Sequence, residues 1–173
     1  ASEVGTTTQS TRDTPAVRYT SSVSAYPSGP RERLTRLSDV CGRVLTDWED
    51  DRILAAFIYG SVLSERWRPD SDVDIAILDC AEQRLSWEQE AKLMDALERA
   101  TGRGIDLRLL RECSLSHQAH VLSEGCRIWI REAAPVDKYS EGVLTAFRQQ
   151  HDRITIQWLA LIDRLACKAD VPQ

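Results

Sequence analysis

The sequence predicts an α/β or α+β fold in which helices flank a small mixed sheet of about four strands and a long helix ends the chain. Apolar segments of strand length recur along the chain, and amphipathic segments of helical period lie between them. Glycines and prolines separate the two kinds of segment. With 173 residues, 42% of them hydrophobic, the chain suffices for one ordinary domain with tails.

The first part of the chain, residues 1–30, is rich in Ser, Thr and Pro and holds few large apolar side chains. Such a composition cannot bury enough apolar surface to offset its ordering entropy, so we expect a disordered leader. It also lacks the apolar middle of a secretory signal peptide. In residues 31–48, apolar side chains recur every three or four positions, which predicts an amphipathic helix.

Four short segments have the composition or the alternation of strands. Residues 53–59 are almost entirely apolar and end at Gly60, as is typical of a buried strand. Residues 72–78 alternate Val and Ile with Asp and Ala, which is the period of a strand. The four predicted strands are 53–59, 72–78, 105–110 and 126–130.

Helical patterns fill the intervals between these strands. A short helix is expected after Gly60, ended by Pro69. The next begins with the plausible N-cap Ser86, followed three residues later by Gln89. After Pro135 a long helical pattern follows, which could break near His151. The predicted helices after the first are 61–67, 86–101, 116–123 and 136–168.

We divide the chain into the leader 1–30, a domain of residues 31–135 and a C-terminal helical extension of residues 136–173. The extension carries apolar side chains that would be costly to leave in water. They could pack back on the domain, form a homodimer or receive a partner protein. They include Trp158, Leu159, Leu161, Ile162 and Leu165.

Composition argues against several classes of protein. The formal net charge of −5 gives no whole-chain basic footprint, so we expect no direct nucleic-acid binding. No apolar run approaches the about 20 residues of a membrane span. The five cysteines are widely spaced without a C-x-x-C pair, which gives little support to a zinc site. We expect reduced thiols in a cytoplasmic protein. They are Cys41, Cys80, Cys113, Cys126 and Cys167.

The strongest chemical signal is the pair Asp72 and Asp74. Residues two apart on a strand face the same side, so their carboxylates should lie close together. Close carboxylates raise each other's pKa unless a cation lies between them, and Mg²⁺ is the obvious cation. A third acid, Asp106, lies on another predicted strand and faces away from its core side. If the strands are neighbours, Asp106 could bind a second metal ion and take the proton of an attacking hydroxyl.

Gly60 and Ser61 follow a predicted strand and precede a predicted helix. Glycine lets the backbone approach a phosphate closely, the helix N-terminus favours an anion, and Ser61 adds a hydroxyl donor. Together with the acid pair, this unit supplies the positioning and charge neutralisation that phosphoryl transfer needs. Either part alone is a weak signal, because acidic strand starts and Gly-Ser turns are common.

These segments resemble the motif of the DNA polymerase β-type nucleotidyltransferase superfamily, in which Gly-Ser is followed after ten residues by Asp-x-Asp. In detail they resemble the minimal nucleotidyltransferase (MNT) family over about residues 31–150. The resemblance implies a nucleotidyltransferase fold, a metal and catalytic role for the three aspartates, and nucleotide binding at Gly-Ser. One departure is Glu65, which would disfavour a triphosphate unless it points away. The segments that carry the resemblance are 58–61, 68–75, 104–107 and 123–129.

The resemblance also implies a partner. Many MNT proteins are antitoxins that transfer AMP from ATP to a tyrosine of a HEPN-family RNase toxin and so neutralise it. This chain is then a Mg²⁺-dependent protein adenylyltransferase with ATP as its substrate. Two alternatives stay open, a non-catalytic antitoxin that acts by stoichiometric binding and a small-molecule nucleotidyltransferase of the aminoglycoside type.

Several other side chains near these motifs have two interpretations each. Trp67 belongs either to the core or beside the nucleotide. Arg66 and Arg68 either contact phosphates or lie on a solvated turn. His117 and His120 are three residues apart, as a metal pair can be, but surface or packing roles are favoured without a third ligand.

Overall fold

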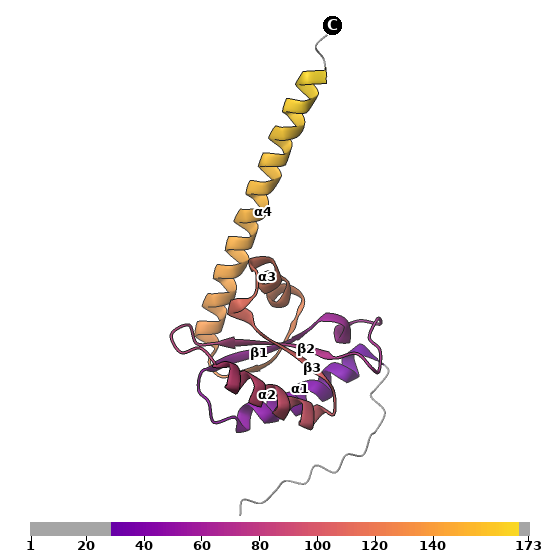
Figure 1. Cartoon of the computed structure of the whole chain (residues 1–173), viewed down its shortest axis with the longest axis vertical. Coiled ribbons are helices and arrows are strands. Elements are labelled where there is room, and N and C mark those ends of the chain that lie inside the picture. The colour runs from indigo at the N-terminus through magenta and orange to yellow at the C-terminus, as the bar shows by residue number, and fades with distance from the viewer. Residues whose placement is uncertain (1–28, 170–173) are drawn as a thin grey trace, which may run out of the picture.

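The computed structural model describes residues 29–169, with side chains described as far as residue 159. Residues 1–28 of the predicted leader lie outside the described residues. Figure 1 shows a sheet with helices on both faces and a long helix that extends away from it. The helices are α1 (Pro30–Asp47), α2 (Trp87–Thr101), α3 (Leu115–Glu124) and α4 (Ala133–Ala169). The strands are β1 (Ile53–Tyr59), β2 (Val73–Asp79), β3 (Ile105–Leu109) and β4 (Cys126–Ile130).

The four strands form one mixed sheet in the order β3-β2-β1-β4. The central strand β1 is antiparallel to both β2 and β4, whereas β2 and β3 are parallel and joined by α2. Every residue of β1 is buried, as its apolar composition predicts for a strand covered on both faces. The predicted small mixed sheet flanked by helices is confirmed.

Two layers of helices cover the sheet. Helices α1 and α2 lie on one face, and α3 with the first turns of α4 lies on the other (Figure 1). Side chains alternate between the two cores along β2, because successive residues of a strand face opposite sides. The α1/α2 core includes Leu37, Cys41, Ile58, Val73, Ile75, Leu93 and Ile105. The α3/α4 core includes Phe57, Tyr59, Ala76, Leu78, Leu110, Val121 and Val136.

Helix α2 begins and ends as its sequence predicts. The Ser86 side chain accepts a hydrogen bond from the backbone N–H of Gln89, whose side chain accepts one from the N–H of Ser86 in return. Gly102 ends the helix with a φ of 67°, a left-handed conformation that glycine adopts without a side-chain clash. The two caps thus fix where α2 begins and ends in the crossover from β2 to β3.

The predicted helix 61–67 is not formed, and a 3₁₀ turn, η1 (Gly60–Leu63), takes its place. Both the backbone N–H and the hydroxyl of Ser64 donate to the carbonyl of Ser61 at 2.9 Å, which closes the turn after one round. The carbonyl of Ser64 accepts a hydrogen bond from Arg33 of α1 at 2.8 Å. An α-helix would use these carbonyls for its own next turn, so these contacts end it early.

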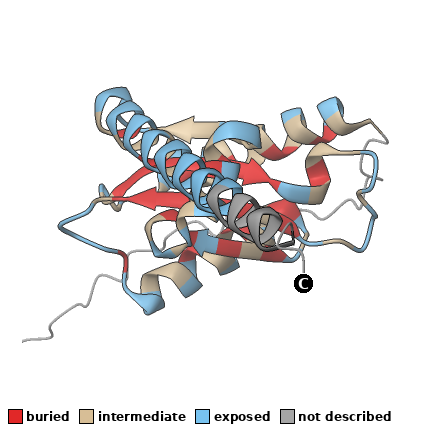
Figure 2. Ribbon diagram, turned by 90° about the horizontal axis from the view of Figure 1, so that it is seen from above, coloured by how far each residue is buried: buried red, intermediate tan, exposed pale blue. Residues whose placement is uncertain are grey.

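Helix α4 begins at Ala133 and is continuous past His151, so the expected break is absent. Pro135 lies in the first turn, where a missing N–H costs no helical hydrogen bond. Val136 and Val143 are buried against the domain, whereas residues 148–159 of the helix are exposed (Figure 2). Leu161, Ile162 and Leu165 lie outside the described side chains. The exposed large apolar residues of α4 are Ile154, Ile156, Trp158 and Leu159.

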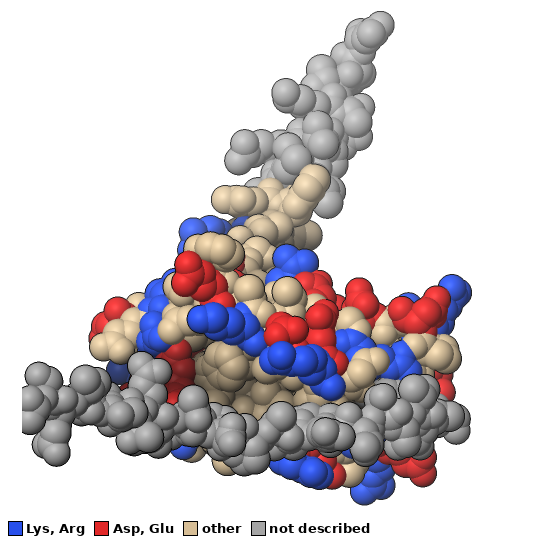
Figure 3. Space-filling model, turned by 60° about the horizontal axis from the view of Figure 1, so that its bottom comes forward, with Lys and Arg blue, Asp and Glu red and all other residues tan. Residues whose placement is uncertain are grey.

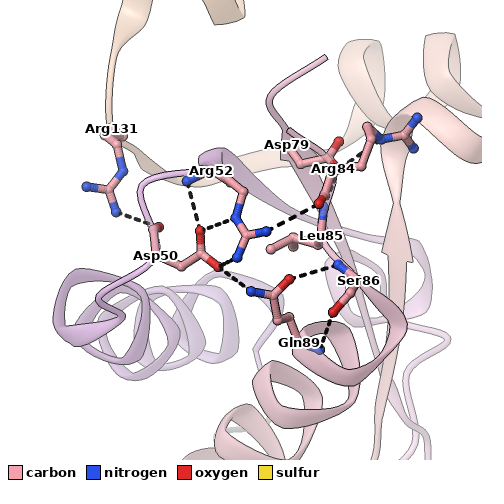
Figure 4. Close-up of polar contacts among 8 residues, drawn as sticks. All are labelled: Asp50, Arg52, Asp79, Arg84, Leu85, Ser86, Gln89 and Arg131. Carbon is pink, nitrogen blue, oxygen red and sulfur yellow. Dashed lines mark hydrogen bonds and ion pairs between the residues drawn. The ribbon is translucent and has the colours of Figure 1, made fainter. Parts of the chain in front are cut away.

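A polar network closes the end of the sheet where β2 ends (Figure 4). The Asp79 side chain is fully buried and accepts hydrogen bonds from Arg84 at 3.0 Å and from the backbone N–H of Leu85 at 3.2 Å. Asp50 is paired with Arg52 at 2.5 Å and accepts a hydrogen bond from Gln89 of α2 at 3.1 Å. These contacts fix the loops that precede β1 and α2.

The surface carries charges of both signs, and the described thiols are not paired in disulfides. In the face seen in Figure 3, basic and acidic side chains are interspersed rather than segregated. Within residues 29–169, no helix is long and apolar enough to cross a bilayer. The cysteines with described side chains are free, and Cys167 lies outside them. The free cysteines are Cys41, Cys80, Cys113 and Cys126.

Candidate active site

Asp74 and Asp106 lie side by side on the α3/α4 face of the sheet. They are register partners on the parallel strands β2 and β3, so the expected neighbourhood of the two strands is confirmed. Their sequence neighbours Val73 and Ile105 point into the α1/α2 core. Because side chains alternate along a strand, this packing turns both carboxylates to the opposite face, where both line one cavity.

Asp72 is exposed and lies one residue before β2. Its carboxylate packs against Gly104, and a Cβ at Gly104 would clash with it. The carbonyl of Gly104 also accepts a hydrogen bond from the backbone N–H of Val73 at 2.9 Å, which aligns the starts of the two strands. Gly104 therefore makes room for the first acid of the Asp-x-Asp pair while fixing the register.

The three carboxylates repel one another. Burial raises the pKa of the Asp74 carboxyl, and the negative charges of Asp106 and Asp72 raise that pKa further. Arg108 and His117 act on it in the opposite direction. An oxygen-rich set of mutually repelling carboxylates fits a hard divalent cation such as Mg²⁺. Among the described side chains, however, no three His, Cys, Asp or Glu groups converge as a finished metal centre.

Arg108 is paired with Asp106, the third acid. Its Nε lies 2.9 Å from Oδ1 of Asp106, and its Nη2 donates a hydrogen bond to Oδ2 at 3.0 Å. The fork of one guanidinium thus meets both oxygens of the third acid. Arg108 was not predicted as a site residue from the sequence, although its position two residues after Asp106 on a strand places it on the same face.

Gly60 is required by its conformation and by its neighbour. Its φ is +77°, in the left-handed region that favours glycine, and a Cβ there would clash with the Asp74 carboxylate. Gly60 therefore makes room for the second acid, as Gly104 does for the first. The anion-binding helix N-terminus expected after it is not formed, because η1 is a single 3₁₀ turn. The hydroxyl of Ser61 and the local backbone are what remains for a phosphate.

Two cavities meet at Tyr59, the last residue of β1. One, of about 420 Å³, holds the acids, and the other, of about 690 Å³, holds the Gly-Ser turn. Burial raises the pKa of Tyr59 to about 12, helped by the charges of Asp74 and Asp106, so its phenol stays neutral. The acid cavity is lined by Tyr59, Asp74, Asp106, Arg108, Cys113, Ser114 and His117. The Gly-Ser cavity is lined by Tyr59, Gly60, Ser61, Leu63, Ser64, Arg66, His120 and Glu124.

The sequence matches the family model described as polymerase beta, nucleotidyltransferase, over residues 48–134. The match covers half of the chain and includes the three aspartates and the Gly-Ser turn. The chain belongs to this nucleotidyltransferase family. Family membership confirms both the expected fold and the expected class of enzyme, one that transfers a nucleotidyl group.

Solved toxin–antitoxin structures contain chains similar in fold to this nucleotidyltransferase. A chain of an MntA–HepT complex is 19% identical with a TM-score of 0.51, over 76% of this chain and 98% of that chain. A chain of a toxin–antitoxin structure with AMP-PNP is 20% identical with a TM-score of 0.54, over 75% and 98%. A chain from the tri-AMPylated Shewanella oneidensis HEPN toxin in complex with MNT antitoxin is 20% identical with a TM-score of 0.51, over 76% and 98%. No curated protein matches the sequence.

The two histidines of α3 serve different cavities of the nucleotidyltransferase. The ring of His117 meets that of Tyr59 edge to face at 5.2 Å and lines the acid cavity. His120 lines the Gly-Ser cavity and lies 3.5 Å from Glu124. The two rings thus line different cavities rather than one.

The loop between η1 and β2 is anchored to the helices by Trp67. The indole ring is contacted by the guanidinium of Arg33 at 4.7 Å and by that of Arg103 at 5.0 Å, and it packs on the α1/α2 core. Trp67 lines neither cavity, so it is a core anchor rather than a wall of the nucleotide site. Glu65 is exposed and lines neither cavity.

Proposed function

We propose that this nucleotidyltransferase is a Mg²⁺-dependent protein adenylyltransferase that transfers AMP from ATP to a tyrosine hydroxyl of a HEPN-type toxin. It would thereby act as the antitoxin of that toxin. The observation that carries the proposal is the pairing of Asp74 with Asp106 beside the Gly60–Ser61 turn, in a chain of this enzyme family.

The aspartates divide the work in this proposal. Asp72 and Asp74 are the residues that would hold the metal, and Asp106 completes the set, in keeping with two ions. Bound Mg²⁺ supplies charge neutralisation at the phosphates of ATP. Asp106 also takes the proton of the attacking tyrosine hydroxyl. The hydroxyl oxygen then bonds to the α-phosphorus of ATP, and pyrophosphate leaves. Its side chain is 40% exposed in the acid cavity, so an acceptor hydroxyl can reach it.

The phosphates are assigned to the Gly-Ser cavity. Ser61 offers a hydroxyl donor and Arg66 a guanidinium, and both line this cavity next to Asp74. Phosphate oxygens accept strong charge-assisted hydrogen bonds from such donors. Tyr59 borders both cavities, so the phosphates on one side and the acceptor on the other would meet at Asp74.

Two observations support a toxin protein as the acceptor of AMP. The similar solved structures are complexes of an antitoxin with a toxin, and one contains a tri-AMPylated HEPN toxin with an MNT antitoxin. The exposed apolar side chains of α4 also offer a surface on which a partner protein could dock. Free cysteines support the cytoplasmic setting in which such a pair would work.

The test uses the full chain, a candidate HEPN-type toxin and ATP labelled on the α-phosphate. We expect label on the toxin and loss of the label when one tyrosine of the toxin is changed to Phe. The RNase activity of the toxin should fall in step with the transfer. A double variant with Asp72→Ala and Asp74→Ala should transfer no label. Equal transfer by the double variant, or none by the unaltered chain, would overturn the proposal.

Stoichiometric occlusion is the competing function, and the exposed apolar face of α4 is the observation that favours it. In that case the double Asp variant still neutralises the toxin fully. A variant with Trp158→Ala and Leu159→Ala then fails, although its site is intact. Because both functions use the exposed face of α4, it is the double Asp variant that separates an enzyme from a simple inhibitor.

A further inference from the structure

The contact between Arg108 and Asp106 is built into β3. The two residues are two positions apart, so both side chains lie on the face that carries the acid cavity. The guanidinium meets both carboxylate oxygens at 2.9 and 3.0 Å. Asp106 is also the register partner of Asp74. An arginine of the protein itself is thus paired with the carboxylate of the third acid.

This contact conflicts with the work proposed for Asp106. A guanidinium and a divalent cation at the same carboxylate repel each other, and the guanidinium also takes lone pairs that metal binding or proton transfer needs. The pair is exposed, at 57% for Arg108 and 40% for Asp106. Exposed ion pairs contribute little to stability, so the contact can be exchanged at small cost.

We propose that Arg108 is a tethered cation that holds Asp106 in the ligand-free enzyme and moves to the phosphate oxygens when metal and nucleotide bind. This inference rests on the proposed function, since it assumes that metal and ATP bind at these aspartates. The planar fork that fits a carboxylate also fits a phosphate. Because Arg108 is fixed to β3 and lines the acid cavity, its guanidinium stays beside the reacting groups after it leaves Asp106.

The test measures metal and nucleotide binding separately, with Mn²⁺ as a paramagnetic probe in place of Mg²⁺. In the absence of nucleotide, R108Q should bind Mn²⁺ more tightly than the unaltered chain, on the order of tenfold, because one competing positive charge is gone. With Mn²⁺ saturating, R108Q should bind AMP-PNP more weakly, by about tenfold. R108K keeps the positive charge without the planar fork. Its Mn²⁺ affinity should therefore equal that of the unaltered chain, and its AMP-PNP affinity should lie between those of R108Q and the unaltered chain.

A matched control is R99Q on α2. Arg99 is paired with Asp95 at 3.0 Å, both side chains are well exposed, and neither lines the two cavities. R99Q makes the same change of charge and should leave both affinities unaltered. Unchanged or weaker Mn²⁺ binding by R108Q, or unchanged AMP-PNP binding, would overturn the inference while leaving the proposed function intact. If D74N binds Mn²⁺ as well as the unaltered chain does, the metal site of the proposed function fails instead, and the inference falls with it.

Discussion

Asp74 and Asp106 are direct register partners on two parallel strands, although 31 residues of the sequence separate them. Parallel strands need a crossover, and α2 provides it across the α1/α2 face. The crossover leaves the opposite face free at this edge of the sheet, where both carboxylates open into the acid cavity.

Asp74 should reduce the stability of the metal-free protein at neutral pH. Its pKa is raised by burial and by Asp106 and Asp72, so the folded pKa exceeds the unfolded one. For a raised pKa, the associated stability is present below the unfolded pKa and is lost as the pH rises through the folded pKa. We therefore expect D74N to unfold at a higher temperature than the unaltered chain at neutral pH without divalent metal. The gain should shrink as the pH falls toward about 4. A D74N protein that melts lower at neutral pH would contradict this account.

Asp106 should matter for turnover more than for nucleotide binding. As the proposed base, its replacement in D106N should lower the transfer rate by about 10²–10⁴-fold while changing the KM for ATP far less. Steady-state transfer with labelled ATP measures both quantities. D95N, an exposed change on α2, is the control and should leave the rate unaltered. A rate for D106N within a few fold of the control would remove the base role.

Gly60 should tolerate no side chain. G60A combines a left-handed backbone with a clash against the Asp74 carboxylate. The conformation alone costs about 1–2 kcal/mol, and displacement of Asp74 should abolish most of the transfer activity. G142A is the matched control, because no atom lies within 4 Å of its new Cβ and it sits inside α4. It should stabilise the protein by about 0.5–1 kcal/mol in urea unfolding. Equal effects of the two changes would refute the packing argument.

Asp79 should be essential for stability although it lies at the other end of β2 from the site. Its side chain is fully buried and held by Arg84 and by the N–H of Leu85. D79A leaves the buried N–H of Leu85 without its acceptor and should cost about 1–3 kcal/mol of unfolding free energy. E112Q removes an exposed partner of the same Arg84 and should cost less than about 1 kcal/mol. Chemical denaturation of both variants decides the point, and similar costs would count against the network of Figure 4.

The exposed apolar side chains of α4 should serve a partner rather than the fold. Trp158 is 60% exposed and Leu159 58%, so replacing both with Ala should change the unfolding free energy by less than about 0.5 kcal/mol. The same double variant should bind the toxin at least tenfold more weakly, as measured by calorimetry, if this face carries the interface. In contrast, Val136 is fully buried, and V136A should destabilise the domain without removing the docking face. Unchanged toxin binding by the double variant would move the interface elsewhere.

Much of the fold was predictable from local patterns. The alternation in 72–78, the apolar run 53–59 and the Ser86–Gln89 capping box predicted elements that the structure contains, because each depends on residues close in sequence. The prediction of a helix at 61–67 failed because contacts with residues distant in the sequence outweighed the local pattern. Arg33 of α1 takes a carbonyl that a helix after Ser61 would have used. This hydrogen bond could not be predicted from the residues around Ser64, since its donor lies 31 residues away in the sequence.

By itself, the sequence determined which groups are available, namely two acids at strand spacing, a third acid on a later strand and a Gly-Ser turn. Only the tertiary structure decided how they meet. It places Asp106 opposite Asp74 and pairs Arg108 with Asp106. It also places Gly60 and Gly104 where a side chain would clash with a carboxylate. The physical reason is that periodicity fixes the face of a strand on which a side chain lies, whereas register and packing between strands fix its neighbours.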